Sequence, residues 1–211
     1  MKINSNLDSL TKLIYNNINI RNICTNQYFK DRIILSSCNI DVDNINFNIF
    51  NNFPGEERTY LSLDDIVLEV TNNNNSTLYP SKYLNSRKPT GLSPLFLKLK
   101  IGCPIILLRN LASHQDYTGN LIFIPRISLT SSISELPFIL RWRQFPIQLA
   151  FAMTINKSQG QSVKHVGLDL RTLVFSHGQL YVALSHCTSL RNIKILLSPN
   201  SNYTLNIVYL E

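Results

Sequence analysis

The chain is organised around the stretch Ala150-Phe-Ala-Met-Thr-Ile-Asn-Lys-Ser-Gln-Gly-Gln-Ser162. Its apolar start predicts the end of a buried strand, and a dense polar cluster follows and closes on Gly160. A cation, two hydroxyls and two amides after a strand suit contact with phosphate, and glycine permits close backbone approach. A capped surface helix facing only water is the alternative, since polar helix starts are common. The cluster consists of Thr154, Asn156, Lys157, Ser158 and Gln159.

A second motif follows after a predicted strand at Val166–Leu170: Phe175-Ser-His-Gly-Gln-Leu-Tyr-Val-Ala-Leu-Ser-His186. It predicts a helix from Ser176 to Ser185, with Ser176 as the N-cap. Apolar residues at helical spacing, namely Leu180, Ala183 and Leu184, would form its inner face. Apolar runs at Ile147–Ala152 and Ile193–Leu197 predict two further strands of the same sheet.

The N-terminal part predicts the start of an α/β fold. Leucines and isoleucine at helical spacing precede a short buried strand at Arg32–Cys38. Asn39 or Asp41 can cap the next helix, which Pro54-Gly55 ends, and Thr59–Ile66 alternates like a strand. Strand, helix and strand in this order form the crossover unit of a parallel sheet. The inner face of the helix would consist of Val42, Ile45, Ile49, Phe50 and Phe53.

The middle of the chain predicts smaller β elements. Phe96–Lys100 and Ile105–Asn110 have strand patterns, and the first alternates apolar with cationic residues. Further along, basic and aromatic residues gather between Arg141 and Phe145, a combination that tracks single strands by charge and stacking. Packing of Trp142 in the interior is the favoured alternative for that ring, because large aromatics are mostly buried.

Composition indicates one globular domain, or one domain with an insertion. The chain has 211 residues, and Lys and Arg outnumber Asp and Glu by 20 to 13, for a net charge of +7. This modest basicity fits a polyanionic partner without proving one. The four scattered cysteines are expected to be free thiols, and no metal site is expected. Without a transmembrane run or secretory signal, an intracellular protein is expected, with no membrane partner.

These motifs resemble those of the PIF (petite integration frequency) family of superfamily-one DNA helicases. Thr154–Ser162 resembles the fifth helicase motif, and Ser176–Ser185 resembles the sixth in its Helitron-transposon form. Arg32, Asn39 and the run Gly55-Glu-Glu-Arg-Thr-Tyr-Leu-Ser62 resemble the fourth motif region. Gly91–Leu111 is similar to the small barrel called the two-B domain, although several later barrel strands are missing. The match covers roughly Tyr28 to Leu197.

The resemblance implies a RecA-like parallel sheet flanked by helices, with a truncated β-barrel insertion. Residues 1–90 and 136–211 would form the second RecA-like motor domain, and 91–135 the insertion. ATP with Mg²⁺ would be the cofactor of the family, and single-stranded DNA the partner. By resemblance, the cofactor contacts are Arg32, Gln159 and Gly160, and the catalytic position is His186. The nucleic-acid contacts are Asn39, Thr154, Asn156, Lys157, Ser158, Tyr181 and Arg143.

Two departures from the family limit the expected activity. None of the seven glycines precedes a lysine, so the Gly-Lys-Ser/Thr phosphate loop is absent. The family arginine that reaches the nucleotide phosphates is replaced by His186, which is shorter and not permanently charged. We therefore expect no ATP hydrolysis by this chain alone, and a missing N-terminal RecA-like domain as its partner.

Three hypotheses follow. The chain is the C-terminal part of a five-prime to three-prime, ATP-dependent DNA helicase, located by family in the nucleus or mitochondrion, with roles in DNA repair, recombination and telomere maintenance. Alternatively, it is a non-catalytic single-strand-binding module, or a degenerate transposon remnant. For His186 we expect partial exposure without a buried partner, while Tyr181 and Leu184 pack inward. Restoring arginine there should then change stability by no more than about 0.5 kcal/mol.

Overall fold

The computed structural model describes residues 2–4, 6–20, 24–67, 94–109, 122–130, 139–160, 162–199, 201 and 203–209. The chain divides into two compact units. The first contains Met1–Glu56, Lys100–Pro104 and Leu149–Glu211, and the second contains Glu57–Leu99 and Ile105–Gln148. The division into 1–90, 91–135 and 136–211 stays a prediction. The predicted short helix at Tyr79–Asn85 lies outside the described residues.

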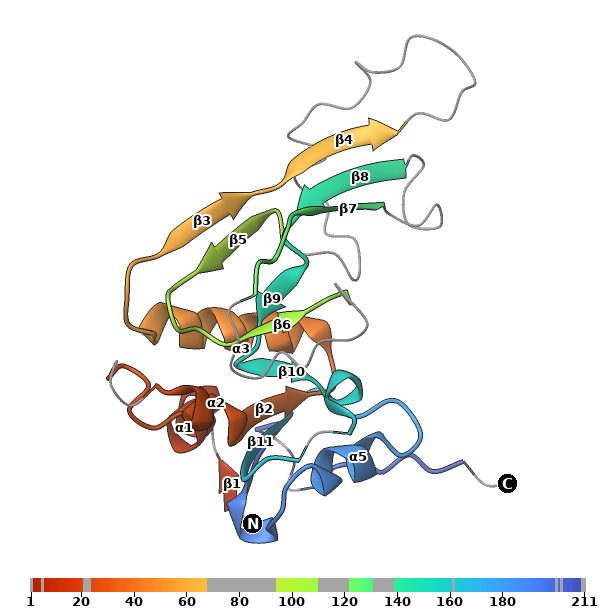
Figure 1. Cartoon of the computed structure of the whole chain (residues 1–211). Helices are drawn as coiled ribbons and strands as arrows, with labels where there is room; N and C mark the ends of the chain where they lie inside the picture. The colour runs from red at the N-terminus through yellow and green to blue at the C-terminus, as the bar shows by residue number, and fades with distance from the viewer. Residues whose placement is uncertain are drawn as a thin grey trace. The chain divides into compact units, whose positions relative to one another are not determined.

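A five-stranded parallel sheet organises the first unit, which confirms the expected α/β class. Its order is β1-β12-β11-β2-β10, and each neighbouring pair is parallel. Because all strands run the same way, their carboxyl ends share one edge of the sheet. Figure 1 shows β1, β11 and β2 within this layer. The strands are β1 (Lys2–Asn4), β2 (Arg32–Ser36), β10 (Ala152–Thr154), β11 (His165–Leu170) and β12 (Ile193–Leu197).

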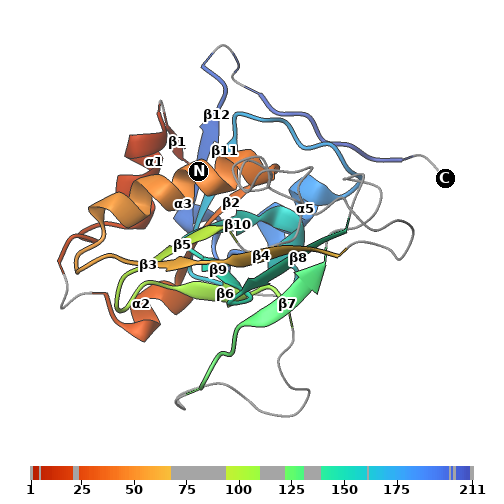
Figure 2. The same ribbon diagram turned by 90° about the horizontal axis from the view of Figure 1, so that it is seen from above.

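Helices cover the sheet where the apolar spacing predicted them. Helix α1 (Leu7–Ile14) begins after Asn6, whose side chain accepts from the Ser9 amide at 2.7 Å, and packs on β11 and β12. Helix α3 (Asn39–Asn52) packs on β10 and β2 through the predicted apolar face (Figure 2). Neither predicted cap holds for α3, because its N-cap is Cys38, which makes no side-chain capping bond.

An aromatic cluster fills one end of this core. Tyr15, Phe29 and Phe53 all pack around Phe151, which is fully buried directly before β10. The Tyr15 hydroxyl donates to the Phe151 carbonyl, and burial raises the pKa of this phenol above its ordinary range. The preceding short helix α2 (Asn26–Lys30) adds Tyr28 to the cluster. These contacts fix the chain at the entry to β10.

The second unit is built from small antiparallel sheets. Strand β3 (Arg58–Leu61) pairs with β5 (Phe96–Leu99), and β8 (Ile139–Gln144) lies between β4 (Leu63–Val67) and β7 (Ile127–Thr130). Another sheet pairs β6 (Ile105–Leu107) with β9 (Ile147–Leu149). The predicted strand Ile147–Ala152 is therefore two strands, β9 and β10, divided by Ala150 and Phe151.

The predicted crossover unit around α3 is wrong. Thr59–Ile66 forms parts of two strands, and β3 joins an antiparallel sheet of the second unit rather than the parallel sheet. Leu61 and Leu63 are 56% and 63% exposed. A strand of a parallel sheet is normally covered on both faces, and these exposures do not meet that condition.

Membrane-spanning helices and disulfides play no part in the described fold. Among the described residues, no helix is both long and apolar enough to span a membrane. All four cysteines are free thiols, as predicted.

Gly167 in β11 should be sensitive to an added methyl group. A Cβ at this position would lie 2.9 Å from Ile14 Cγ1 and 3.1 Å from Ile34 Cγ1, both in the packed core. Gly167→Ala should therefore lower the free energy of unfolding by about 1–3 kcal/mol through overpacking. Urea unfolding measures this change, with Asn44→Ala on the exposed face of α3 as control. Equal unfolding midpoints for Gly167→Ala and the native chain would contradict the packing of α1 on the sheet.

Candidate nucleic-acid interface

The polar cluster lies at the carboxyl edge of the parallel sheet. Thr154 ends β10 and is followed by the 3₁₀ helix η1 (Ile155–Ser158), not by the expected α-helix. A 3₁₀ helix has three residues per turn, so Ile155 and Ser158 share its buried side. Asn156 and Lys157 between them are exposed. The turn therefore presents an amide and a cation to solvent while its ends are anchored in the core.

The turn ends at a conformation that favours glycine. Gln159 and Gly160 follow η1 and are both exposed, and Gly160 has a φ of +86°. Apart from its chain neighbours, no heavy atom of the described residues lies within 4 Å of the position that a Cβ would take at Gly160. Glycine is thus explained by the backbone angle, and the open space leaves this backbone accessible to a ligand.

Ser158 connects the turn to helix α5 (Gln179–Ser185). Its Oγ lies 2.6 Å from the Ile155 carbonyl oxygen and 2.9 Å from Nε2 of His186. A hydroxyl carries a single proton, and the contact with the carbonyl uses it. We infer that Nε2–H of His186 donates to Ser158 Oγ. Both side chains are buried, and η1 packs on α5.

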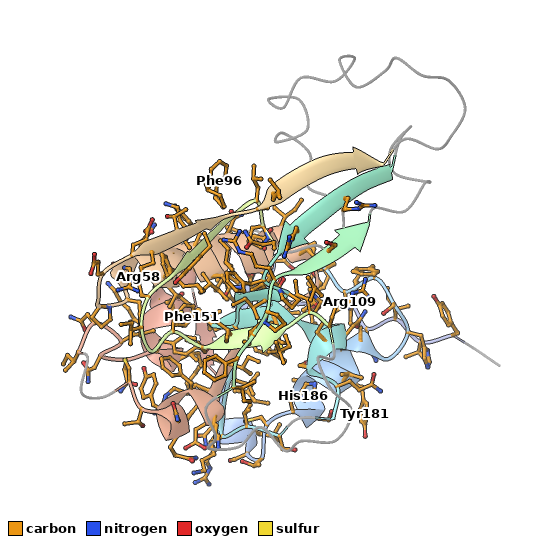
Figure 3. All side chains as sticks on the ribbon, turned by 45° about the horizontal axis from the view of Figure 1, so that its top comes forward. Arg58, Phe96, Arg109, Phe151, Tyr181 and His186 are labelled. Carbon is orange, nitrogen blue, oxygen red and sulfur yellow. The ribbon has the colours of Figure 1, made fainter. Side chains whose placement is uncertain are left out.

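The expected orientation of the sixth-motif helix is wrong. His186 is only 4% exposed, whereas Tyr181 is 74% exposed. Figure 3 shows the Tyr181 side chain pointing away from the body of the protein. The buried positions Gln179, Ala183 and His186 have the spacing i, i+4 and i+7 of one helix face. Ala183 is buried as predicted, whereas Leu180 and Leu184 are only half-buried, and Gln179 and His186 take inner positions instead.

The start of α5 explains part of this difference. The helix begins at Gln179, after Gly178 in the left-handed region with a φ of +68°, and not at Ser176. Gln179 is buried, and its Oε1 accepts from the Phe175 amide at 3.0 Å. Gln179 therefore supports the loop before α5 and occupies an inner position of this helix. The sequence pattern favours a leucine at such a position.

Arg32 is not at the cluster. It opens β2 and therefore lies at the amino edge of the sheet, opposite Thr154, which pairs with Ser36 at the carboxyl end of the same strand. Arg32 thus lies at the edge opposite the cluster, and its role as a cofactor contact stays a prediction. Its Nη1 donates to the Tyr28 carbonyl at 3.1 Å, and its guanidinium lies 4.2 Å from the centre of the Tyr28 ring.

The other predicted contacts divide between the two units. Asn39 is exposed at the start of α3, after the carboxyl end of β2, and thus shares the edge with the cluster. Arg143 is exposed on β8 in the second unit. Beside it, Gln144 is buried and donates to the Tyr60 carbonyl at 2.9 Å, while the Phe145 ring meets the Tyr60 ring edge to face. Of Trp142 only the backbone is described.

The sequence motifs did not predict a charged network at the carboxyl edge. Asp169 near the end of β11 is fully buried, and two of its contacts with the Arg171 guanidinium measure 2.6 and 2.9 Å. The hydrogen bonds to Asp169 are the main reason why the pKa of Arg171 is raised. Asp41 of α3 lies 3.9 Å from the same guanidinium and accepts from the Thr172 hydroxyl at 2.7 Å. The network joins the loop after β11 to α3.

The described residues of this edge do not fit a nucleotide phosphate site. The His186 ring is buried against Ser158, and the Arg171 guanidinium is held between two carboxylates. No lysine follows any glycine of the sequence. Among the described residues, no three His, Cys, Asp or Glu side chains converge in a group that could hold a metal ion. The exposed chemistry is that of Asn156, Lys157 and Gln159, which suits a phosphodiester backbone.

Comparison with known proteins gives one family throughout. The family model "DNA helicase Pif1, 2B domain" matches residues 82–115. "ATP-dependent DNA helicase PIF1" of Rattus norvegicus is 32% identical over 139 residues, covering 55% of this chain and 21% of the relative. "ATP-dependent DNA helicase PIF7" of Trypanosoma brucei brucei is 54% identical over 52 residues, covering 25% of this chain and 5% of the relative. The chain thus spans about a fifth of the rat relative.

Solved structures agree with the sequence relatives. A chain from a structure of DNA unwinding at forked dsDNA by two coordinating Pif1 helicases is 25% identical, with a TM-score of 0.57 over 90% of this chain and 42% of its own. Pif1 helicase from Bacteroides in complex with ADP-AlF3 and ssDNA has a TM-score of 0.56 at 22% identity, covering 97% of this chain and 47% of its own. The second likeness supports the fold alone.

The contact between Ser158 and His186 should make the two side chains energetically coupled. His186→Leu keeps bulk but removes the donor, and Ser158→Ala removes the acceptor. Each should destabilise the chain by about 1–3 kcal/mol, because it leaves a buried polar atom without this partner. The double variant should lose less than the sum, with a coupling energy of about 0.5–3 kcal/mol.

His186→Arg belongs in the same urea-unfolding series. The added length and fixed charge of arginine cannot occupy the buried site. His186→Arg should therefore lower the free energy of unfolding by more than about 1 kcal/mol, whereas a negligible change was expected from the sequence. Strictly additive effects of the two single changes would contradict the contact. An arginine variant as stable as the native chain would show that position 186 can face solvent.

Proposed function

This chain belongs, as a partial sequence, to the PIF1 family of DNA helicases, and from that premise we propose that its carboxyl edge binds single-stranded DNA for a helicase motor. The turn η1, with Asn156 and Lys157 exposed and Ser158 buried, is the observation that carries this proposal. Amide and ammonium groups on a short turn can follow a phosphate backbone without reading its bases. Gln159 and the open backbone at Gly160 extend this polar surface.

Tyr181 supplies an exposed aromatic ring, the second feature that single-strand binding uses. Its ring is 74% exposed on α5, and α5 packs directly on η1. Unpaired bases stack on exposed aromatic rings at about 1–3 kcal/mol per base, whatever their identity. A cationic turn beside an aromatic helix thus combines backbone contact with stacking. Thr154, which is half-buried at the end of β10, and Asn39 on the same sheet edge complete the proposed interface.

The chain would serve as the second half of the motor. Relatives are named ATP-dependent helicases, and phosphoryl transfer needs a phosphate loop and a metal site. This chain has no Gly-Lys pair, so we propose that a RecA-like domain outside it holds ATP and Mg²⁺. His186 then acts as a structural residue within this half instead of a nucleotide contact. The nucleus or mitochondrion is the proposed location of such a DNA-acting protein.

The purified chain should not hydrolyse ATP. Without the phosphate-loop lysine, the phosphates are neither held nor neutralised, so turnover should stay at the buffer background with or without single-stranded DNA. Phosphate release measured across size-exclusion fractions tests this expectation. A DNA-stimulated rate that follows the protein peak would overturn it. A complete PIF1-family helicase assayed in the same way is the positive control.

Single-stranded DNA should bind weakly and in a salt-dependent way. Lys157→Ala should reduce the slope of log affinity against log salt by about 0.7, the change expected when one phosphate of a single strand is no longer neutralised. Tyr181→Ala should weaken binding by about 1–3 kcal/mol with little change of slope, because stacking involves no counterion release. Fluorescence anisotropy of a labelled oligothymidine at several salt concentrations measures both quantities.

Lys164→Ala is the matched control, because it removes an exposed cation from the opposite edge of the sheet. It should leave single-strand affinity and slope unchanged. Native affinity and slope in both Lys157→Ala and Tyr181→Ala would show that single-stranded DNA binds elsewhere or not at all.

A further inference from the structure

The amino edge of the parallel sheet carries a second row of basic residues, which the proposed function does not use. Neighbouring strands β12, β11 and β2 each have a basic residue at or next to their first position: Lys194, His165 and Arg32. Lys164 precedes β11, and Arg191 lies in the 3₁₀ helix η2 (Leu190–Asn192) directly before β12. Adjacent strands are about 4.8 Å apart, so the row extends roughly 10 Å across the three strands.

Two residues of the row have exposed side chains. The Lys164 side chain is 61% exposed, and Arg191 is also exposed. Asp31, directly before β2, lies 3.1 Å from Lys164 Nζ and accepts from the Gln27 side-chain amide at 2.9 Å. Ion pairs this exposed contribute little and exchange readily for another anion.

The pKa of His165 is lowered by two kinds of effect at this edge. Burial of the ring lowers it first, and the charge of Arg32 lowers it next. Lys164 and Lys194 act in the same direction, whereas Asp31 acts in the opposite one. Cations from three neighbouring strands thus affect one imidazole. The electrostatic fields of these cations add up at this edge, and a positive potential of this kind attracts an extended polyanion.

We propose that this amino edge binds the phosphate backbone of double-stranded DNA. A row about 10 Å long can contact more than one phosphate of a duplex strand, which carries one negative charge per roughly 3.4 Å of helix axis. Among the described residues of the edge, no aromatic side chain is largely exposed: Tyr28 is 7% exposed, and the Arg32 guanidinium lies over its ring. Without a stacking surface, backbone contact is favoured over single-strand binding.

The two edges should act independently. Arg32 and Ser36 are the ends of β2, and four residues of rise separate them by about 13 Å. The choice of DNA over an acidic protein rests on the proposed function, because a helicase half meets both single-stranded and duplex DNA. The presence of a basic surface does not depend on it.

Binding of a fluorescent blunt-ended duplex to the full chain tests this proposal by anisotropy at several salt concentrations. The double variant Lys164→Ala/Arg191→Ala should lower the slope of log affinity against log salt by about 1.8, or about 0.9 for each phosphate that is no longer neutralised. Its affinity for oligothymidine should stay native. Lys157→Ala is the matched control, with the same kind of charge change at the other edge: it should leave duplex binding unchanged.

Three results would overturn the proposal. They are a native duplex slope in the double variant, an equal loss of affinity for duplex and single strand, or equally tight binding of polyglutamate at the same edge. The last would assign the edge to an acidic protein. Urea unfolding of each variant checks its fold, and if the Lys164 change disturbs folding, Arg191→Ala alone should still lower the slope by about 0.9. Failure of the single-strand proposal can be distinguished from failure of the duplex proposal. In the first case, Lys157→Ala and Tyr181→Ala would bind oligothymidine with native affinity.

Discussion

Two hydrogen bonds between the Asn46 side chain and the backbone of Ala152 support the candidate interface. Strand β10 is the last strand of the sheet, with β2 on one side. On its other side, the Ala152 amide donates to Asn46 Oδ1 at 2.8 Å, and Asn46 Nδ2 donates to the Ala152 carbonyl at 3.0 Å. A side-chain amide has the donor and acceptor of a neighbouring strand. Asn46 therefore satisfies a sheet edge that is otherwise open.

This edge bond matters because β10 is short and leads directly into η1. The strand has three residues, and its register with β2 places Thr154 opposite Ser36. If β10 shifted, Lys157 and Ser158 would move with it, because both lie in η1, the single turn that directly follows the strand. The aromatic packing around Phe151 at one end and the Ser158–His186 contact at the other restrict that movement. The interface is thus held by buried contacts on both sides of an exposed turn.

The sequence correctly predicted those helices and strands that their own apolar pattern determines. The apolar spacing of α3 and the mostly apolar sequence of β11 leave few alternatives, and both form as expected. The role of Asn46 could not be predicted, because α3 contains six asparagines with the same local chemistry and only tertiary contact distinguishes one. The buried Asp169 has a weak signal in sequence, a carboxylate in an apolar strand two residues before Arg171. A buried acid requires such a partner.

The burial of His186 could not be predicted from the sequence motif, for a physical reason. The motif Tyr-Val-Ala-Leu-Ser-His fits either of two helix faces one position apart, and leucine at 180 and 184 favours the wrong one. The correct face is selected by Gln179, whose side chain supports the loop at Phe175, and by Ser158, which accepts from the imidazole. Arginine could not occupy this enclosed space beside a serine hydroxyl without carrying an uncompensated charge inside. Histidine supplies an N–H of the required reach. Position 186, which was expected to contact the nucleotide, is instead part of the buried support of the turn η1.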